Sequence, residues 1–338
     1  MTQTIQAAAD AQAETEATHA EVRQRRQRMI ALVQGQALLL ILVGLLVFFS
    51  IASSYFFTST NLLAMGGTAA VLGLMAIAQT FLVVSGGIDI SIGSNAAMTS
   101  VMIGVFYQHG ANIWIAALLA VIIAVAIGAL NGTVAVLLKV DPLVTTLGTY
   151  SIFLGASYMV SGAQSLAISE NSFAFVGTGQ IAGVPFALAL FAVIWLAGLF
   201  VERRMTPGRA IYAIGGNIEA ARLSGIRINR LRFVVYVLSG LSAGVAGVIL
   251  TSQLSTASPD IGATYLLSVI TAVILGGASL KGGRGSLVGT LLAVAILGVL
   301  QNGFSLLSVS SFAQTMVLGL FLIAAVLIDQ TARRLRST

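Results

Sequence analysis

The sequence predicts an all-α polytopic membrane protein with about ten transmembrane helices, both termini in the cytoplasm and one short cytoplasmic helix. Three observations lead to this prediction. First, 57% of the 338 residues are hydrophobic and only 8% are charged, whereas soluble domains carry roughly 25% charged residues. Second, apolar stretches long enough to cross a bilayer recur between polar or glycine-rich breaks. Third, all 17 Lys and Arg residues fall on one face once those stretches are drawn as spans, as the positive-inside rule requires.

The chain divides into a tail, one membrane domain and a second tail. Residues 1–30 are polar and mixed in charge, so we expect a cytoplasmic tail that forms no core. A single transmembrane domain follows over residues 31–330, and residues 331–338 form a basic cytoplasmic tail. An even number of spans keeps every basic residue inside, and a shift by one span would scatter them over both faces. The predicted spans are residues 31–54, 62–85, 89–107, 113–138, 143–161, 184–201, 231–252, 263–280, 286–306 and 309–329.

Composition also excludes several classes of function. The chain has no cysteine, and its two histidines, His19 and His109, lie outside the predicted spans. An intramembrane enzyme needs a nucleophile with a base or a set of metal ligands, so these absences argue against one. The net charge of +6 follows from topology alone, and a nucleic-acid partner is not required. We expect a non-catalytic protein of the bacterial inner (plasma) membrane.

Two glycine-rich breaks interrupt the predicted spans in a similar way. Residues 85–94 and residues 276–286 each place a Gly pair after one span and a Gly-Ser just inside the next. This similarity indicates a parallel internal repeat, with chance similarity as the alternative. The second break also contains Lys281, yet it lacks the G-x-x-x-x-G-K-[ST] order that cradles phosphates. No nucleotide site is therefore predicted.

The longest cytoplasmic loop, residues 202–230, predicts a short surface helix. Asn217 is a good N-cap, Glu219 suits the first turn, Arg222 falls later, and Gly225 can end the helix. Two interpretations fit: a positive-inside loop with one chance helical turn, or a coupling helix that docks in a soluble motor subunit. A helix this short has no core of its own, so something else must bind it, whereas periodicity alone favours the first interpretation. The residues assigned to coupling are Gly216, Asn217, Glu219, Ala220, Ala221, Arg222, Leu223, Ser224 and Gly225.

Four motifs in order resemble one family. The motifs are residues 215–226, residues 85–94, Thr145 to Gly148 after Asp141 and Pro142, and residues 276–285 with Gln301 to Gly303 beyond them. Together they resemble the permease subunits of ATP-binding-cassette (ABC) importers of the ribose, xylose and arabinose type. The matches run from about residue 60 to 330. The long polar N-terminal tail and the uncharged loop near residues 162–183 depart from the pattern without touching these motifs.

The resemblance implies a set of partners. It implies a second permease copy, most simply in a homodimer, together with an ABC ATPase subunit of twin-cassette type. It also implies a periplasmic sugar-binding protein that delivers a pentose or similar small sugar, and membrane lipid around the spans. ATP and Mg²⁺ would be bound by the ATPase subunit, so no cofactor is expected in this chain.

Polar residues within the spans mark a candidate translocation path. Asp89 is the strongest of them, because a carboxylate at bilayer depth costs about 2.5–3.5 kcal/mol on insertion scales and must find partners. One interpretation makes Asp89 a cap of the third span at the cytoplasmic rim, with Ser91 assisting; the other makes it a group of the pathway near the midplane. The path candidates are Asp89, Ser91, Asn131, Thr145, Thr146, Gln301 and Asn302.

Other functions remain as alternatives. The cargo of an otherwise similar importer could be a furanose signal molecule or a branched-chain amino acid. An ion-coupled secondary transporter would need membrane carboxylates, and Asp89 is the only good candidate. Interhelical hydrogen bonding accounts for polar residues in spans without any pathway.

Overall fold

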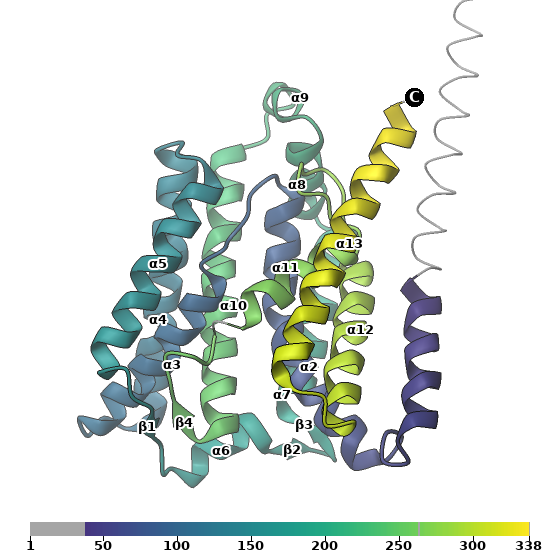
Figure 1. The fold of residues 1–338 in the computed structure, drawn as a ribbon. Helices are drawn as coiled ribbons and strands as arrows, with labels where there is room; N and C mark the ends of the chain where they lie inside the picture. Colours follow the sequence, from purple (N-terminus) through teal and green to yellow (C-terminus); the bar gives the residue numbers. More distant parts are fainter. Residues whose placement is uncertain (1–37, 263, 338) are drawn as a thin grey trace, which may run out of the picture.

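The computed structural model describes residues 38–262 and 264–337, and the fold of this part is almost wholly helical (Figure 1). The predicted tail at residues 1–30 and the first residues of the first predicted span lie outside the described residues. Within this described part, six helices are long and apolar enough to cross a membrane. They are α2 (Ser59–Val84), α4 (Ile113–Gly132) with its π-helical end η1 (Thr133–Leu137), α5 (Pro142–Ser161), α7 (Phe186–Arg204), α10 (Ile228–Leu254) and α12 (Leu287–Leu306).

The other predicted spans also contain helices, but these are shorter or less apolar. They are Leu38–Ala52, α3 (Ile92–Gln108), α11 (Tyr265–Leu275) and α13 (Ser311–Ser337), whose apolar part is Ser311–Ala324. The eighth predicted span is the poorest match, because α11 has only 11 residues. The all-α class is confirmed, and the crossing of the membrane about ten times stays a prediction.

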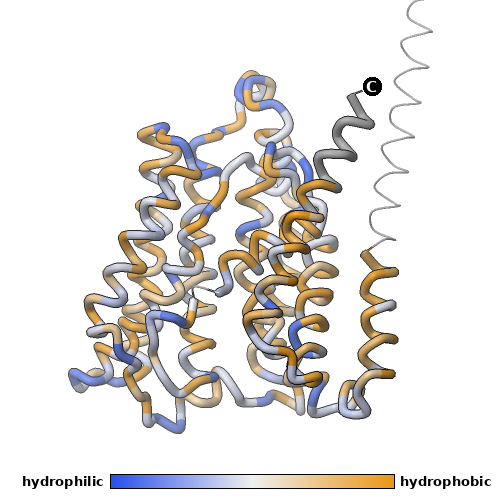
Figure 2. The backbone as a smooth tube through the Cα atoms, viewed as in Figure 1, coloured by the Kyte–Doolittle hydropathy of each residue, from blue (hydrophilic) through white to orange (hydrophobic). Residues whose placement is uncertain are grey.

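Hydropathy follows the long axis of the helices. Apolar residues cover the middle of the bundle, and polar residues gather at its two ends (Figure 2). α9 (Ile218–Leu223) projects beyond the other helices at one end (Figure 1). The basic residues that the structure describes belong to segments at this same end: the turn before α5, the end of α7, α8 (Thr206–Gly216), α9, the start of α10, the loop between α11 and α12, and the end of α13.

The opposite end of the molecule carries small ordered elements that the sequence did not indicate. The stretch predicted as a plain loop near residues 162–183 contains α6 (Asn171–Thr178) and the short strands β1 (Leu166–Ala167) and β2 (Gln180–Ile181). A third strand, β3 (Val184–Pro185), occupies the first residues of the sixth predicted span. β1 pairs with β4 (Thr256–Ala257), and β2 pairs with β3. The β1–β4 pair ties the segment after α5 to the segment after α10.

Each of the two glycine-rich breaks lies between a long helix and a shorter one. After α2 ends at Val84, the chain runs back along the bundle before α3 begins at about half its height (Figure 1). α11 likewise occupies only part of the height of the bundle before residues 276–286 lead into α12. The first break therefore leaves non-helical backbone within the bundle, where neighbouring groups must satisfy its hydrogen bonds, whereas the second lies at the α9 end.

Close backbone contact between α4 and α10 holds the centre of the bundle. Gly128 on α4 and Gly240 on α10 face each other, and a Cβ added at Gly128 would lie 2.9 Å from the Cα of Gly240. A Cβ added at Gly240 would overlap the carbonyl oxygen of Ala124. Because membrane helices associate through packing more than through the hydrophobic effect, such small residues determine how near two helices can come.

The Gly240→Ala variant tests this contact. We expect it to destabilise the protein by about 1–3 kcal/mol, because the added methyl group overpacks a backbone contact. The measurement is the thermal unfolding midpoint of the purified protein in detergent. Gly44→Ala is the matched control, because nothing lies within 4 Å of a Cβ at Gly44. Equal midpoints for the two variants would contradict the packing argument.

Candidate functional site

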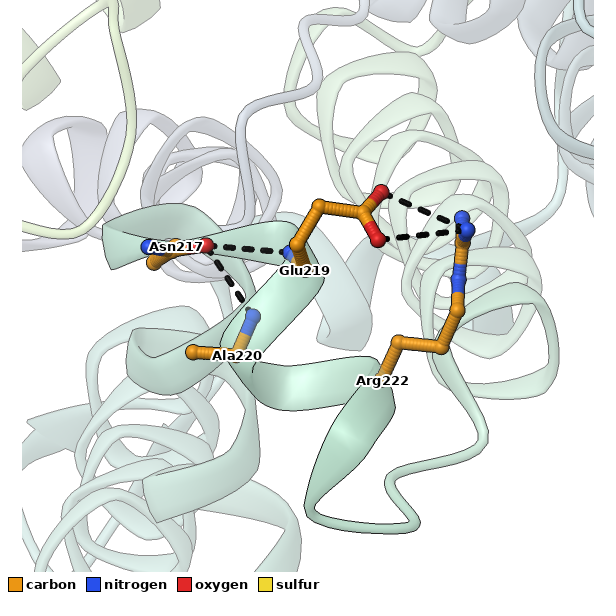
Figure 3. A network of polar contacts seen from close by, with 4 residues as sticks. All are labelled: Asn217, Glu219, Ala220 and Arg222. Atoms are coloured by element: carbon orange, nitrogen blue, oxygen red, sulfur yellow. Dashed lines mark hydrogen bonds and ion pairs between the residues drawn. The ribbon is translucent and has the colours of Figure 1, made fainter.

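The predicted surface helix is present as α9, and its first turn is capped as expected. The side-chain oxygen of Asn217 accepts hydrogen bonds from the backbone N–H groups of Glu219 and Ala220, both at 3.0 Å (Figure 3). Gly225 follows the helix with a φ of +75°, a conformation that favours glycine. The local sequence is therefore sufficient to begin and end this helix.

α9 presents a polar pair and an apolar side chain to its surroundings. Arg222 and Glu219 form an ion pair with 3.3 Å between Nη1 and Oε1, and both side chains are largely exposed (Figure 3). Leu223 is 89% exposed. Such an exposed pair stabilises a protein little, so these side chains are available for contact with another molecule. Of the residues assigned to coupling, the exposed ones are Gly216, Asn217, Glu219, Ala220, Arg222, Leu223, Ser224 and Gly225.

The expectation that this helix has no core of its own is wrong. Ala221, also assigned to coupling, is buried and packs in a small cluster with Ile214 of α8 and Ile228 at the start of α10. Only one methyl group of α9 enters the cluster, so the sequence pattern carried little signal for it. α9 is thus held on one side by its own chain and exposed on the other.

α8 was missed by the sequence analysis. It begins with Thr206 and has Pro207 in its first turn, a position that suits proline. Its Tyr212 hydroxyl lies 2.5 Å from Oε1 of Glu202 and 3.0 Å from the carbonyl oxygen of Gly285. Burial, followed by the hydrogen bond to Glu202, raises the pKa of the Tyr212 phenol, so the phenol remains a proton donor at neutral pH.

A buried polar cluster surrounds Asp89 in the backbone break before α3. Asp89 is only 1% exposed. Its Oδ1 accepts from the backbone N–H of Ser91 at 2.9 Å and from the Ser91 hydroxyl at 2.6 Å. Its Oδ2 accepts from the hydroxyl of Ser239, on α10, at 2.6 Å. The carboxylate thus fastens the break to α10, and its acceptors are occupied by donors of this chain.

The same cluster extends to α4 and α5. Asn131 of α4 donates to the Ser91 hydroxyl at 2.7 Å and lies 3.5 Å from Oδ1 of Asp89. Thr149 of α5 donates to the amide oxygen of Asn131 at 2.8 Å. Ser91 is the N-cap residue of α3, but its side chain makes no capping hydrogen bond. Asp89 is therefore buried among donors of its own chain, and its role as a cap or as a pathway group stays a prediction.

The remaining path candidates divide into two groups. Thr146 lies near the Asp89 cluster, since its hydroxyl is 3.4 Å from the carbonyl oxygen of Ile88. The buried hydroxyl of Thr145 has no hydrogen-bond partner among the described residues. Asn302 of α12 is elsewhere and exchanges two amide hydrogen bonds with Asn61 of α2, at 3.0 and 2.8 Å. Gln301 is exposed.

Two members of the Asp89 cluster were not identified from the sequence. Ser239 precedes Gly240 in a stretch that reads as small-residue packing, and Thr149 is one of several threonines near the start of α5. Spacing along each helix gave no sign that these hydroxyls belong to the Asp89 cluster. Ser239, for example, is 150 residues from Asp89 in the sequence. Only the three-dimensional arrangement brings them together.

Substitutions of Asp89 separate a supporting role from a pathway role. Asp89→Ala leaves the Ser91 and Ser239 donors unpaired, which costs about 1–3 kcal/mol, so we expect a lower unfolding midpoint. Asp89→Asn keeps one acceptor oxygen and should have a smaller effect on the midpoint, with solute uptake per assembled protein retained. Assembly of the Asn variant at the wild-type level together with loss of uptake would place the carboxylate in the pathway instead.

Comparison with known proteins identifies the family. Residues 61–326 match the family described as branched-chain amino acid transport system / permease component. The ribose import permease protein of Escherichia coli is 36% identical over 309 residues, which cover 90% of this chain and 96% of that protein. The ribose import permease protein of Bacillus subtilis is 37% identical over 313 residues, covering 92% and 97%. The L-arabinose transport system permease protein of Escherichia coli is 35% identical over 284 residues, covering 84% and 86%.

No solved structure matches the chain. The similarity to the curated relatives nevertheless extends over most of each protein, and it confirms the resemblance that the four sequence motifs indicated. Together with six helices able to cross a membrane, it identifies a multi-pass protein of the inner (plasma) membrane. The chain belongs to the family of membrane permease components of ABC transport systems.

Proposed function

We propose that this chain is the membrane-spanning subunit of an ATP-driven importer that translocates a pentose or similar small sugar. The observation that carries the proposal is the similarity to ribose and arabinose permeases over most of the chain. Sugars are neutral and rich in hydroxyl groups, so a pathway lined by amides and hydroxyls suits them. A periplasmic binding protein would deliver the sugar at the end of the molecule opposite α9.

In this proposal α9 contacts a partner ATPase subunit, most simply of twin-cassette type. ATP and Mg²⁺ would bind to that subunit, and this chain would hydrolyse nothing itself. Support comes from the position of α9, which projects beyond the bundle at the end where the basic segments gather (Figure 1). ATP can drive transport only if nucleotide-dependent docking favours one arrangement of the spans over the other. A projecting helix that packs on α8 and on the start of α10 can impose such a bias.

A second copy of this chain would complete the translocation unit as a homodimer, with lipid around the remaining surface. The many exposed apolar side chains of α5, α7 and α13 support the proposal that lipid surrounds these helices. The family description also names branched-chain amino acids, which keeps them as the second candidate cargo. The sugar is favoured because the relatives named above are ribose and arabinose permeases.

Reconstitution tests the proposal. The purified permease, its ATPase and its binding protein in liposomes should take up radiolabelled ribose or arabinose only when ATP is supplied to the ATPase side. Leucine in place of the sugar is the control for the second cargo. Uptake of leucine but not of either sugar would contradict the sugar assignment, and uptake driven by an ion gradient without ATP would contradict the importer class.

Charge reversal on α9 tests its contact with the ATPase. We expect Glu219→Lys or Arg222→Glu to lower uptake roughly tenfold, because exposed charges at a docking surface must match those of the partner. The double variant, which restores an opposite-charge pair on α9, controls for the stability of the helix itself. The measurement is sugar uptake by the reconstituted complex at equal permease content. Wild-type uptake in both single variants would show that α9 does not dock through these charges.

Cysteine labelling tests the topology, since the chain has no cysteine of its own. Ala220→Cys on α9 and Gln164→Cys at the other end of the bundle are both exposed positions. A membrane-impermeant maleimide added to intact spheroplasts should label residue 164 alone, and labelling of residue 220 should require lysis. Labelling of residue 220 in intact spheroplasts would overturn the proposed orientation.

A further inference from the structure

Three segments that are far apart in the sequence meet next to α9. They are the last turn of α8, the turn that follows α2 at residues 84–87, and the loop between α11 and α12 at residues 276–286. We call this meeting point the glycine junction and define it by Val84, Gly215, Gly282 and Gly283. The first segment leads directly into α9, and the other two lead into α3 and α12.

The contacts in the glycine junction are between backbones. A Cβ added at Gly215 would overlap the carbonyl oxygen of Val84 and the backbone nitrogen of Gly283. A Cβ added at Gly282 would lie 3.1 Å from the Cα atoms of both Gly215 and Gly86. The backbone N–H of Gly283 donates to the carbonyl oxygen of Val84 at 2.8 Å. No side chain separates the three segments at this point.

The local conformation also requires glycine. Gly86, Gly282 and Gly283 have φ values of +83°, +85° and +73°, which other L-residues adopt only with strain. Both glycine-rich breaks therefore contain glycines with positive φ at the point where they meet. They come together in space, and Gly215 lies between them and α9.

A carboxylate on α7 reinforces the glycine junction. Oε1 of Glu202 accepts from the Tyr212 hydroxyl of α8 at 2.5 Å and from the backbone N–H of Leu287 at 3.1 Å. Leu287 is the first residue of α12, so one oxygen atom joins α8 to the start of α12. The indole N–H of Trp195, also on α7, donates to the carbonyl oxygen of Leu287 at 3.1 Å.

The guanidinium of Arg232 binds the remaining segment, the turn that follows α2. Arg232 of α10 donates from Nε to the carbonyl oxygen of Ser85 at 3.0 Å and also from Nη2 to the same oxygen. Through this contact the turn after α2 is bonded to α10. α10 in turn begins at Ile228, which packs under α9. Each segment of the glycine junction is thus tied both to another segment and to a long helix.

We propose that the glycine junction, with Glu202 as its positioning residue, transmits movement of α9 to the two backbone breaks that precede α3 and α12. The inference rests on the proposed function, since it presumes that an ATPase moves α9. Backbones in van der Waals contact cannot be compressed, so a displacement of α8 is passed on to both breaks. A contact between flexible side chains would absorb the same displacement.

Variants of Glu202 test the proposal with little disturbance of packing. Glu202→Gln retains an oxygen that can accept from Tyr212 and Leu287, whereas Glu202→Leu removes both hydrogen bonds. In the reconstituted complex we expect Glu202→Leu to lower the amount of sugar moved per ATP hydrolysed roughly tenfold, within the range of known coupling energies. Glu202→Gln should restore the ratio to near the wild-type value, and Tyr212→Phe should give an intermediate ratio.

The amount of sugar moved per ATP hydrolysed distinguishes a residue that transmits movement from one that only stabilises the fold. A variant that only loses stability lowers uptake and ATP hydrolysis together, and its ratio stays at the wild-type value. Gly240→Ala, which overpacks the α4–α10 contact away from the glycine junction, is the control for that outcome. A wild-type ratio for Glu202→Leu would overturn the proposal, even with reduced protein in the membrane.

Gly215→Ala provides a second, independent variant. We expect it to retain ATP hydrolysis in the complex while uptake falls, because its methyl group pushes the end of α8 away from both breaks. If Gly215→Ala does not assemble, the sugar moved per ATP hydrolysed by the Glu202 and Tyr212 variants decides whether the glycine junction transmits movement. Absence of ATP-dependent sugar uptake by the wild-type complex would instead contradict the proposed function, so the two failures are distinguishable.

Discussion

The whole arrangement depends on satisfying the backbone between Val84 and Ile92, where the chain leaves its helical hydrogen bonding between α2 and α3. In a bilayer an unpaired peptide group costs several kcal/mol, so a break survives only where other groups take over. Asp89 fixes the polar side of this break through Ser91 and Ser239, and Arg232 binds the carbonyl oxygen of Ser85. Helices α4, α5 and α10 are therefore positioned as partners of the break as much as of one another.

Close contact is the second requirement, and small residues satisfy it. Gly128 and Gly240 let α4 approach α10 until backbone meets backbone, which brings Asn131 and Ser239 within reach of Asp89. The same device recurs at the α9 end, where Gly215 and Gly283 replace side-chain contact by backbone contact. Close approach of the backbones in this protein comes from glycine, which has no side chain, and it is combined with a few hydrogen-bonded carboxylate and guanidinium groups.

The sequence was sufficient for what depends on local pattern. Hydropathy located the helices, and Asn217 with Gly225 predicted both ends of α9. The sequence was insufficient where distant segments meet: α8 was missed, α11 proved shorter than predicted, and Ser239 gave no sign that it faces Asp89. Asp89, Ser91 and Asn131 share one cluster, yet Gln301 and Asn302, selected by the same criterion of polarity within a span, lie apart from it. Polarity marks hydrogen bonding in general, and only the fold distinguishes which groups cooperate.

The burial of Ala221 has a consequence for engineering. Because α9 packs on Ile214 and Ile228, a segment that is to be exchanged between proteins must extend beyond the exposed loop. A chimera that exchanges only residues 217–225 between two related permeases would pack a foreign helix against residues of α8 and α10 that do not match it. Exchange boundaries at Thr206 and beyond Ile228 would transfer α8 and the start of α10 together with α9, so that its packing contacts are kept.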